Sequence, residues 1–149
     1  MKKGQSTLEY LITYGWAILI IVVIAAILWY FGVFNPSRWA GKQATGFSRF
    51  VVDDFVVNTS GGLTLVLGSK EDKRIQNVNV TVLFGNGTVR DWDNVSSMGP
   101  GSAYTFHIDN ATDPGSVGDS YRLSVRILYT KGSLSHSDEG TLIGTMEST

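Results

Sequence analysis

The chain has 149 residues and no cysteine, and 17% of its residues are charged, against roughly 25% in an average soluble domain. Without cysteine it has neither a disulfide framework nor a cysteine-ligated zinc site. The last 112 residues carry 10 basic and 12 acidic side chains, and this near-neutral balance argues against a nucleic-acid-binding surface. A segment of that length suits one domain.

The first predicted element in chain order is a helix that is apolar on every face. No Asp, Glu, Lys or Arg occurs in the 28 residues from Tyr10 to Ser37. As a helix, residues 10–34 would be about 37 Å long, which is enough to cross a hydrocarbon layer of about 30 Å. The run is longer than the apolar stretch of about 7–15 residues in a cleaved secretory signal. Lipid or other helices must cover it, and we expect it to end at Asn35-Pro36.

A few residues before this run narrow the interpretation. Lys2, Lys3, Gly4 and Gln5 lie near the start of the sequence, and Glu9 stands at the edge of the apolar helix. A carboxylate at the edge of a membrane-spanning helix is costly and usually has a partner. The pattern resembles the class III signal peptide of archaeal type IV prepilins, and the resemblance covers about the first 34 residues.

The resemblance implies that a prepilin peptidase recognises Lys2 and Lys3 and cuts between Gly4 and Gln5, so that the helix stays on the mature protein. Glu9 would then pair with the free amine of Gln5 on a neighbouring subunit and set their register. The implied partners are copies of the same chain, the prepilin peptidase, a pilus assembly ATPase and a membrane platform protein. The precursor would lie in the cell membrane, and the mature protein in an extracellular filament.

Beyond Gly41 the hydrophobic period changes from helical to alternating, which is typical of half-buried strands. The clearest case is residues 121–129, where the residues expected on one face are Tyr121, Leu123, Val125, Ile127 and Tyr129. Alternation also predicts strands at residues 63–67, 78–84 and 104–108, and weaker patterns suggest strands at 47–57, 88–92 and 140–146.

Turn residues separate these strands at residues 60–62, 69–73, 85–87, 98–101 and 113–115, and residues 84–88 indicate a tight hairpin. About seven short strands in some 100 residues predict an immunoglobulin-like β-sandwich. The expected fold class is α+β, one long N-terminal apolar helix followed by an all-β immunoglobulin-like sandwich. We expect residues 1–4 as a removed signal, 5–34 as the membrane or filament-core helix, 35–46 as a linker and 47–149 as the exported domain.

The asparagines also indicate an exported domain. Five of the seven begin an Asn-x-Ser/Thr sequon, where chance would give about one. The sequons begin at Asn58, Asn79, Asn86, Asn94 and Asn110. We expect Asn79 on the solvent side of its strand and the other four in or beside turns, so that each can carry a glycan. Strands rich in Ser and Thr also raise the count, which leaves a purely structural origin open.

Few residues suggest catalysis. His107 is expected on the outer side of a strand and His136 in a polar segment, both as solvated side chains. Residues 91–94 (Asp-Trp-Asp-Asn) offer oxygen atoms to Ca²⁺ but lack the glycine and closing glutamate of an EF-hand loop, so a polar turn is preferred. Residues 71–74 (Glu-Asp-Lys-Arg) suit a solvated loop. With no Ser/His/Asp ordering, P-loop or HExxH motif, we expect no enzyme activity, no cofactor and no metal.

The sequence thus predicts a structural pilin subunit that polymerises through its N-terminal helix into a type IV pilus-like filament, with a role in surface adhesion and with glycans on the outside. One alternative is a membrane-anchored minor adhesin or binding protein, or an archaellin-like filament subunit, with the same signal peptide. The other is a plain membrane anchor that carries an exported enzyme, which would need a catalytic constellation.

Overall fold

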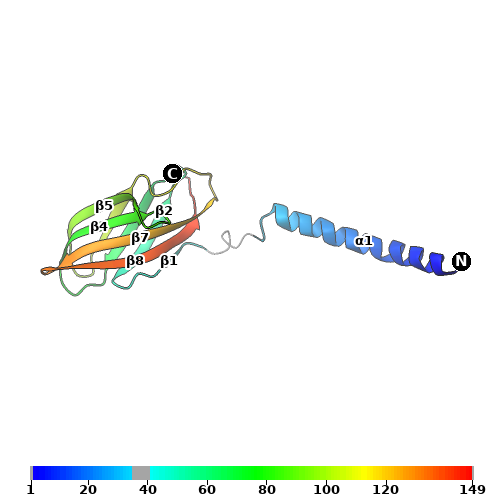
Figure 1. Ribbon diagram of the computed structural model, residues 1–149, viewed down its shortest axis with the longest axis horizontal. Helices are drawn as coiled ribbons and strands as arrows, with labels where there is room; N and C mark the ends of the chain where they lie inside the picture. The colour runs from blue at the N-terminus through cyan, green and yellow to red at the C-terminus, as the bar shows by residue number, and fades with distance from the viewer. Residues whose placement is uncertain (1, 35–40, 149) are drawn as a thin grey trace. The chain divides into compact units, whose positions relative to one another are not determined.

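Two units, Met1–Trp39 and Ala40–Thr149, make up the chain in the computed structural model (Figure 1). The structure describes residues 2–34 and 41–148. The first unit contains the helix α1, Lys2–Tyr30, and a turn at residues 31–34. All the strands belong to the second unit.

The helix α1 ends earlier than the sequence predicts because Gly32 stops it. Gly32 has a φ of 65°, in the left-handed region that suits glycine. The N–H of Val33 donates to the carbonyl of Leu28 at 3.0 Å, and the N–H of Gly32 donates to the carbonyl of Trp29 at 2.9 Å. This pair of bonds is a Schellman motif, which satisfies carbonyls in the last turn of a helix. The expected stop at Asn35-Pro36 lies outside the described residues.

The second unit is built from two antiparallel sheets. The strands are β1 (Gln43–Thr45), β2 (Phe50–Val57), β3 (Leu63–Ser69), β4 (Ile75–Leu83), β5 (Val89–Met98), β6 (Ala103–Ile108), β7 (Ser120–Lys131) and β8 (Leu134–Thr145). One sheet has the order β1-β8-β7-β4-β5 and the other the order β2-β3-β6. Figure 1 shows the five-stranded sheet in front, with β2 behind it.

The connections between the strands are those of an immunoglobulin-like sandwich. The pairs β2–β3, β4–β5 and β7–β8 are hairpins within one sheet, whereas the chain changes sheet from β3 to β4, from β5 to β6 and from β6 to β7. In the constant-type immunoglobulin domain the fourth strand joins the sheet of the first two; here β5 stays beside β4, and β1 adds a strand outside β8. The expected fold class, an apolar helix followed by a β-sandwich, is confirmed.

Alternate residues of the two sheets form the core. The buried side chains of β2, β3, β6 and β7 include Phe50, Phe55, Val57, Leu63, Leu65, Leu67, Phe106, Ile108, Tyr121, Leu123, Val125, Ile127 and Tyr129. The alternation predicted for residues 121–129 is therefore confirmed. Two edge-to-face ring pairs join the sheets: Phe50 with Tyr129, at 5.3 Å between centroids, and Phe55 with Tyr121, at 6.5 Å.

Some strand boundaries differ from the sequence pattern because pairing, and not periodicity, sets them. β5 continues to Met98 and β8 begins at Leu134, since both strands pair along their length with a long neighbour. Phe84, which alternation placed in line with Val82, follows the end of β4 and is 44% exposed. β1 lies within residues 35–46, which the sequence assigned to a linker.

The second unit should fold without the helix, because all the buried residues of its core lie between Phe50 and Met146. We expect a fragment from Gly41 to Thr149 to be soluble, monomeric and rich in β-structure. Circular dichroism and sedimentation velocity check this. A helical far-UV spectrum, or aggregation as severe as that of the full chain, would contradict it.

Candidate functional site

The first candidate site is the N-terminal part of α1. Lys2 and Lys3 lie in its first turn, and the helix continues without a break through the expected cleavage point between Gly4 and Gln5. Gly4, Gln5 and Glu9 are exposed. A Cβ atom added to Gly4 would meet no heavy atom within 4 Å. In the described residues, both sides of the expected scissile bond are therefore accessible to a second protein.

The remainder of α1 is apolar on every side. Its side chains that are more than 60% exposed include Leu11, Ile12, Trp16, Leu19, Ile21, Val22 and Trp29. The helix is long and apolar enough to cross a membrane. Such a helix is stable only where lipid or other apolar helices enclose it.

The second candidate site is the set of five sequons. Asn86, Asn94 and Asn110 are exposed, whereas Asn58 and Asn79 are half-buried. Asn86 lies in the β4–β5 hairpin, and Asn58 and Asn110 lie just after β2 and β6. Asn94 is within β5 and not beside a turn, contrary to expectation, and it lies directly opposite Asn79 of β4.

Three of these sequons share one contact, in which the hydroxyl of the third residue donates to the amide oxygen of the asparagine. The distances are 2.6 Å for Ser60–Asn58, 2.7 Å for Thr81–Asn79 and 2.7 Å for Thr88–Asn86. The surroundings differ, because β4 is paired on both sides and Thr81 is buried. The Asn79 sequon is therefore less accessible in the folded domain than the Asn86 sequon, whose asparagine is exposed in a hairpin.

Asp91 and Asp93 belong to β5 and do not form the expected polar turn. One carboxylate oxygen of each accepts the N–H of the following residue, at 2.9 and 2.7 Å. The other oxygen accepts a further backbone N–H: that of His107 in β6 donates to Asp93 at 2.8 Å, and that of Asn110, just after β6, donates to Asp91 at 3.0 Å. These carboxylates satisfy edge N–H groups where β5 and β6 meet. In the described residues no group of three or more His, Asp or Glu side chains is placed to hold a metal ion.

The two histidines make different surface contacts. His107 is exposed on β6, with Nδ1 3.4 Å from the hydroxyl of Thr64. His136 is also exposed, and its ring stacks on Tyr129 at 5.4 Å between centroids. In each case the histidine contacts the residue opposite it on the neighbouring strand.

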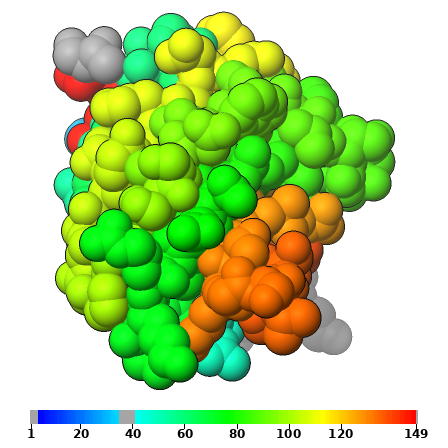
Figure 2. All heavy atoms as spheres, turned by 90° about the vertical axis from the view of Figure 1, so that its left-hand side faces the viewer, coloured from blue at the N-terminus to red at the C-terminus, as the bar shows by residue number. Residues whose placement is uncertain are grey.

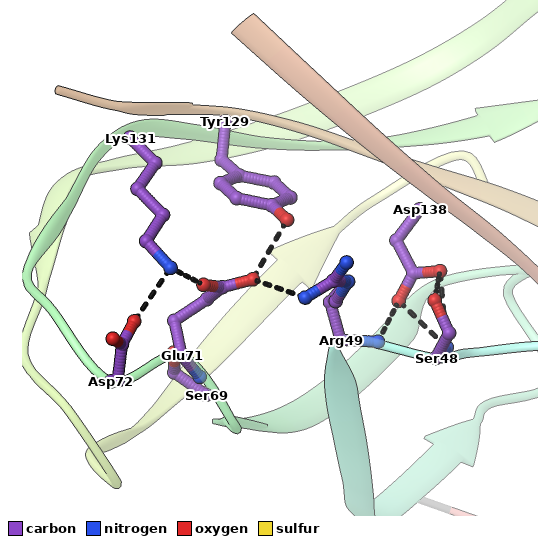
Figure 3. A network of polar contacts seen from close by, with 8 residues as sticks. All are labelled: Ser48, Arg49, Ser69, Glu71, Asp72, Tyr129, Lys131 and Asp138. Carbon is purple, nitrogen blue, oxygen red and sulfur yellow. Dashed lines mark hydrogen bonds and ion pairs between the residues drawn. The ribbon is translucent and has the colours of Figure 1, made fainter. Parts of the chain in front are cut away.

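A buried carboxylate, which the sequence did not single out, lies where the loop before β4 meets the β7–β8 hairpin (Figure 3). In Figure 2 the green segment that leads into β4 adjoins the orange hairpin at the surface. Glu71 was expected in a solvated loop but is 5% exposed. The Tyr129 hydroxyl donates to its Oε1 at 3.0 Å, and Lys131 Nζ donates to its Oε2 at 2.5 Å. Arg49 lies 3.7 Å from Oε1, and Lys131 also donates to Asp72 at 2.6 Å.

These contacts shift the pKa values of the cluster in opposite directions. The hydrogen bond from Lys131 lowers the pKa of the Glu71 carboxyl and outweighs burial, which acts to raise it. Hydrogen bonds to Asp72 and Glu71 raise the pKa of Lys131. Burial, with the hydrogen bond to Glu71, raises the pKa of Tyr129. The cluster is therefore an ion pair that stays charged at neutral pH and ties two distant loops together.

Asp138 of β8 joins the sheets in a similar way, ahead of β2 (Figure 3). Its buried carboxylate accepts the N–H groups of Ser48 and Arg49 at 3.0 and 2.8 Å, and the Ser48 hydroxyl at 3.0 Å. No local pattern predicts this role, because the residues before Asp138 form a polar run.

Tyr121 carries a polar hydroxyl group into the apolar core. Among the described residues its buried hydroxyl has no hydrogen-bond partner, and burial raises its pKa to about 12. Because the unfolded chain would ionise near pH 10, stability linked to this group is fully present below pH 10 and is lost as pH rises toward 12.

We expect Tyr121→Phe to raise the free energy of unfolding by about 1 kcal/mol at pH 7, because it removes an unsatisfied polar group. Above pH 10 the gain should grow by about 1.4 kcal/mol per pH unit. Urea unfolding of the fragment from Gly41 to Thr149 at pH 7 and pH 11 measures both effects. A gain that does not change with pH would count against this account.

Two comparisons of the sequence with known proteins give no match that would identify these sites. No model of a known protein family matches the chain, and a search of curated proteins finds no significant match. The functional interpretation therefore rests on α1, its head and the surface of the sandwich.

Proposed function

We propose that the chain is a filament subunit of the type IV pilin class, which polymerises through α1 after a prepilin peptidase removes residues 1–4. The observation that carries the proposal is α1 itself. It is one continuous helix whose only charged side chain after the expected cleavage point is Glu9. A plain anchor needs no carboxylate at that position, and a carboxylate at the edge of an apolar helix needs a partner.

The apolar surface of α1 supplies the driving force for assembly. Lipid covers it in the precursor, and cleavage removes Lys2 and Lys3, the charges that hold the head at the membrane surface. Burying roughly 20 large side chains at about 1.5–3 kcal/mol each favours a helix bundle over water by tens of kcal/mol. Relative to lipid the exchange is nearly balanced, so assembly needs work from an ATPase and a platform protein.

Glu9 would set the register between neighbouring helices. Its partner is the amine freed at Gln5 of the next subunit, because that amine is the nearest cation in a bundle of cleaved chains. If the helices are parallel, pairing the fifth residue with a first residue offsets them by four residues, or about 6 Å along the axis. Only this offset neutralises the carboxylate inside the bundle.

The sandwich domain would form the outer layer of the filament and present its glycans and its adhesion surface to the surroundings. The exposed sequons at Asn86, Asn94 and Asn110 support this placement, as does the apolar core that the domain forms from its own residues.

Sheared surface material from cells that make the protein tests the proposal. Negative-stain microscopy should show filaments in wild-type cells, none of that type when the gene is deleted, and filaments again when the full chain is restored. Filaments that persist without the chain, with another protein as their main component, would identify it as an anchor or a minor component.

A further inference from the structure

The β4–β5 hairpin places an exposed aromatic ring beside a sequon. The N–H of Phe84 donates to the carbonyl of Thr88 at 2.8 Å, and the N–H of Gly87 donates to the carbonyl of Phe84 at 2.8 Å. Gly87 has a φ of 82°. These features define a three-residue loop made of a turn and a glycine bulge, with Phe84 and Thr88 beside each other across it and Asn86 between them.

The loop fixes the side chain of Asn86. Its Oδ1 accepts the N–H of Thr88 at 3.0 Å and the hydroxyl of Thr88 at 2.7 Å. Both bonds use the amide oxygen, so Nδ2, the atom that bears the sugar in an N-linked glycan, takes no part in them. Asn86 is exposed, and it therefore presents its sequon in a set conformation without unfolding.

The side chain of Phe84 is also held in place, in this case by Arg90, in the domain without a glycan. The Arg90 guanidinium lies over its ring, with Cζ 4.9 Å from the centroid. Arg90 donates to the carbonyl of Asn110 at 2.9 Å and to Asp113 at 2.5 Å, which fixes it in turn. Phe84 nevertheless remains 44% exposed. A supported, solvent-facing ring has already lost the freedom that binding would otherwise remove.

We propose that Asn86 is N-glycosylated in the folded domain and that the first sugar packs its C–H groups against the open side of Phe84, with Arg90 as the support behind the ring. The inference rests on the export of the domain in the proposed function. Weak attraction between C–H groups and an aromatic face suits this arrangement.

The modification is a group transfer from a lipid-phosphate-linked sugar, catalysed by a membrane oligosaccharyltransferase. Nδ2 of Asn86 attacks the anomeric carbon, and an N–C bond forms. The C–O bond to the lipid phosphate breaks, and the lipid phosphate leaves with the electron pair. The amide proton passes to a base of the transferase.

Other sequons lack the full combination. The Asn94 sequon shares only the exposed aromatic residue two positions before it, Trp92, which is 53% exposed, because this sequon is extended within β5 and not held in a turn. The residue two before Asn110 is Ile108, which is 1% exposed and cannot meet a sugar. Asn79 lies on a strand that is paired on both sides, and its sequon hydroxyl at Thr81 is buried. In the folded domain, Asn86 is therefore the sequon whose glycan would lie beside a supported aromatic ring.

The test combines glycopeptide mass spectrometry with calorimetric unfolding of the full chain in detergent. The wild type, Phe84→Leu, Asn86→Asp and the double variant are purified from cells that make the protein. Asn86→Asp keeps an oxygen acceptor for Thr88 but cannot be glycosylated. We expect a glycan at Asn86, and a fall of about 4 °C in Tm from Phe84→Leu. With Asn86→Asp the same change should lower Tm by less than about 1 °C.

Leu128 provides the matched control, because it is 45% exposed on β7. Leu128→Ala should shift Tm equally with and without Asn86→Asp. An unmodified Asn86 overturns the inference, and so does a Phe84→Leu effect that is equal in both backgrounds. Glycans at other sequons alone would overturn it while leaving export intact. Filaments built from chains with an unmodified Asn86 would leave the proposed function standing.

Discussion

Glu9→Gln should lower filament yield at least tenfold, while membrane insertion and cleavage of the precursor stay largely intact. The substitution keeps the shape of the side chain but removes its charge. Inside a bundle of apolar helices the amine at Gln5 of the next subunit would then be buried without a partner, at a cost of several kcal/mol for each interface. Insertion depends on residues 10–30, which are unchanged.

Glu9→Asp is the matched variant, because it keeps the charge on a shorter arm and should reduce the yield less. The yield is measured as sheared filament relative to processed protein in the membrane. Normal filament numbers with Glu9→Gln would remove the charge-pairing mechanism. A fall in processed protein that equals the fall in filaments would place the defect in cleavage and not in assembly.

Glu71→Ala should lower the free energy of unfolding of the sandwich domain by about 2 kcal/mol, or Tm by about 8 °C. It leaves the buried Tyr129 hydroxyl without its acceptor and separates the loop before β4 from the β7–β8 hairpin. The loss is at the low end for a buried ion pair because Lys131 and Arg49 are partly exposed and water can solvate them.

Glu139→Ala is the control, since Glu139 pairs with Arg126 on the exposed face, where an ion pair contributes about 0–1 kcal/mol. Urea unfolding of the fragment from Gly41 to Thr149 compares the two. If both variants lose the same free energy of unfolding, the Glu71 cluster stabilises the domain no more than an exposed ion pair does.

The lowered pKa of Glu71 gives this prediction a pH dependence. A carboxyl whose folded pKa lies below its unfolded pKa adds stability above the unfolded value of about 4.3, and the contribution is lost as pH falls through the folded value. The stability gap between wild type and Glu71→Gln should therefore narrow below about pH 4. A gap that stays constant from pH 7 to pH 3 would contradict the ion pair.

The sequence reveals those features of the fold that are local. Alternation at residues 121–129 predicted the core face of β7 because each buried residue marks its own position. The apolar run predicted α1 for the same reason. The end of the helix differs from the predicted one, because Gly32 forms the cap four residues before the proline at residue 36.

The features that sequence reasoning missed depend on contacts between distant residues. Nothing local distinguishes Glu71 from Asp72, and the burial of Glu71 follows from Tyr129 and Lys131, which lie far along the chain. Residues 91–94 suggest a polar turn by their composition, yet Asp91 and Asp93 lie in β5. In β5 they are retained because they satisfy N–H groups where the two sheets meet.

The candidate sites likewise combine local features, which the sequence predicts, with features that depend on contacts between distant residues. The head of α1 and all five sequons are local patterns and could be found by inspection. The accessibility of each asparagine could not, since Asn79 and Asn94 become opposite neighbours only when β4 pairs with β5. The support of Phe84 by Arg90 likewise needs the hairpin to form first.

The N-terminus of the subunit in purified filaments tests the account most directly. Sheared filaments are separated from membranes, and the first residue of their main protein is determined by mass spectrometry of the N-terminal peptide. We predict that this residue is Gln5, with Lys2, Lys3 and Gly4 removed and α1 otherwise intact. A chain that starts at Met1, or one that starts beyond Ala26 and so lacks most of the helix, would contradict it.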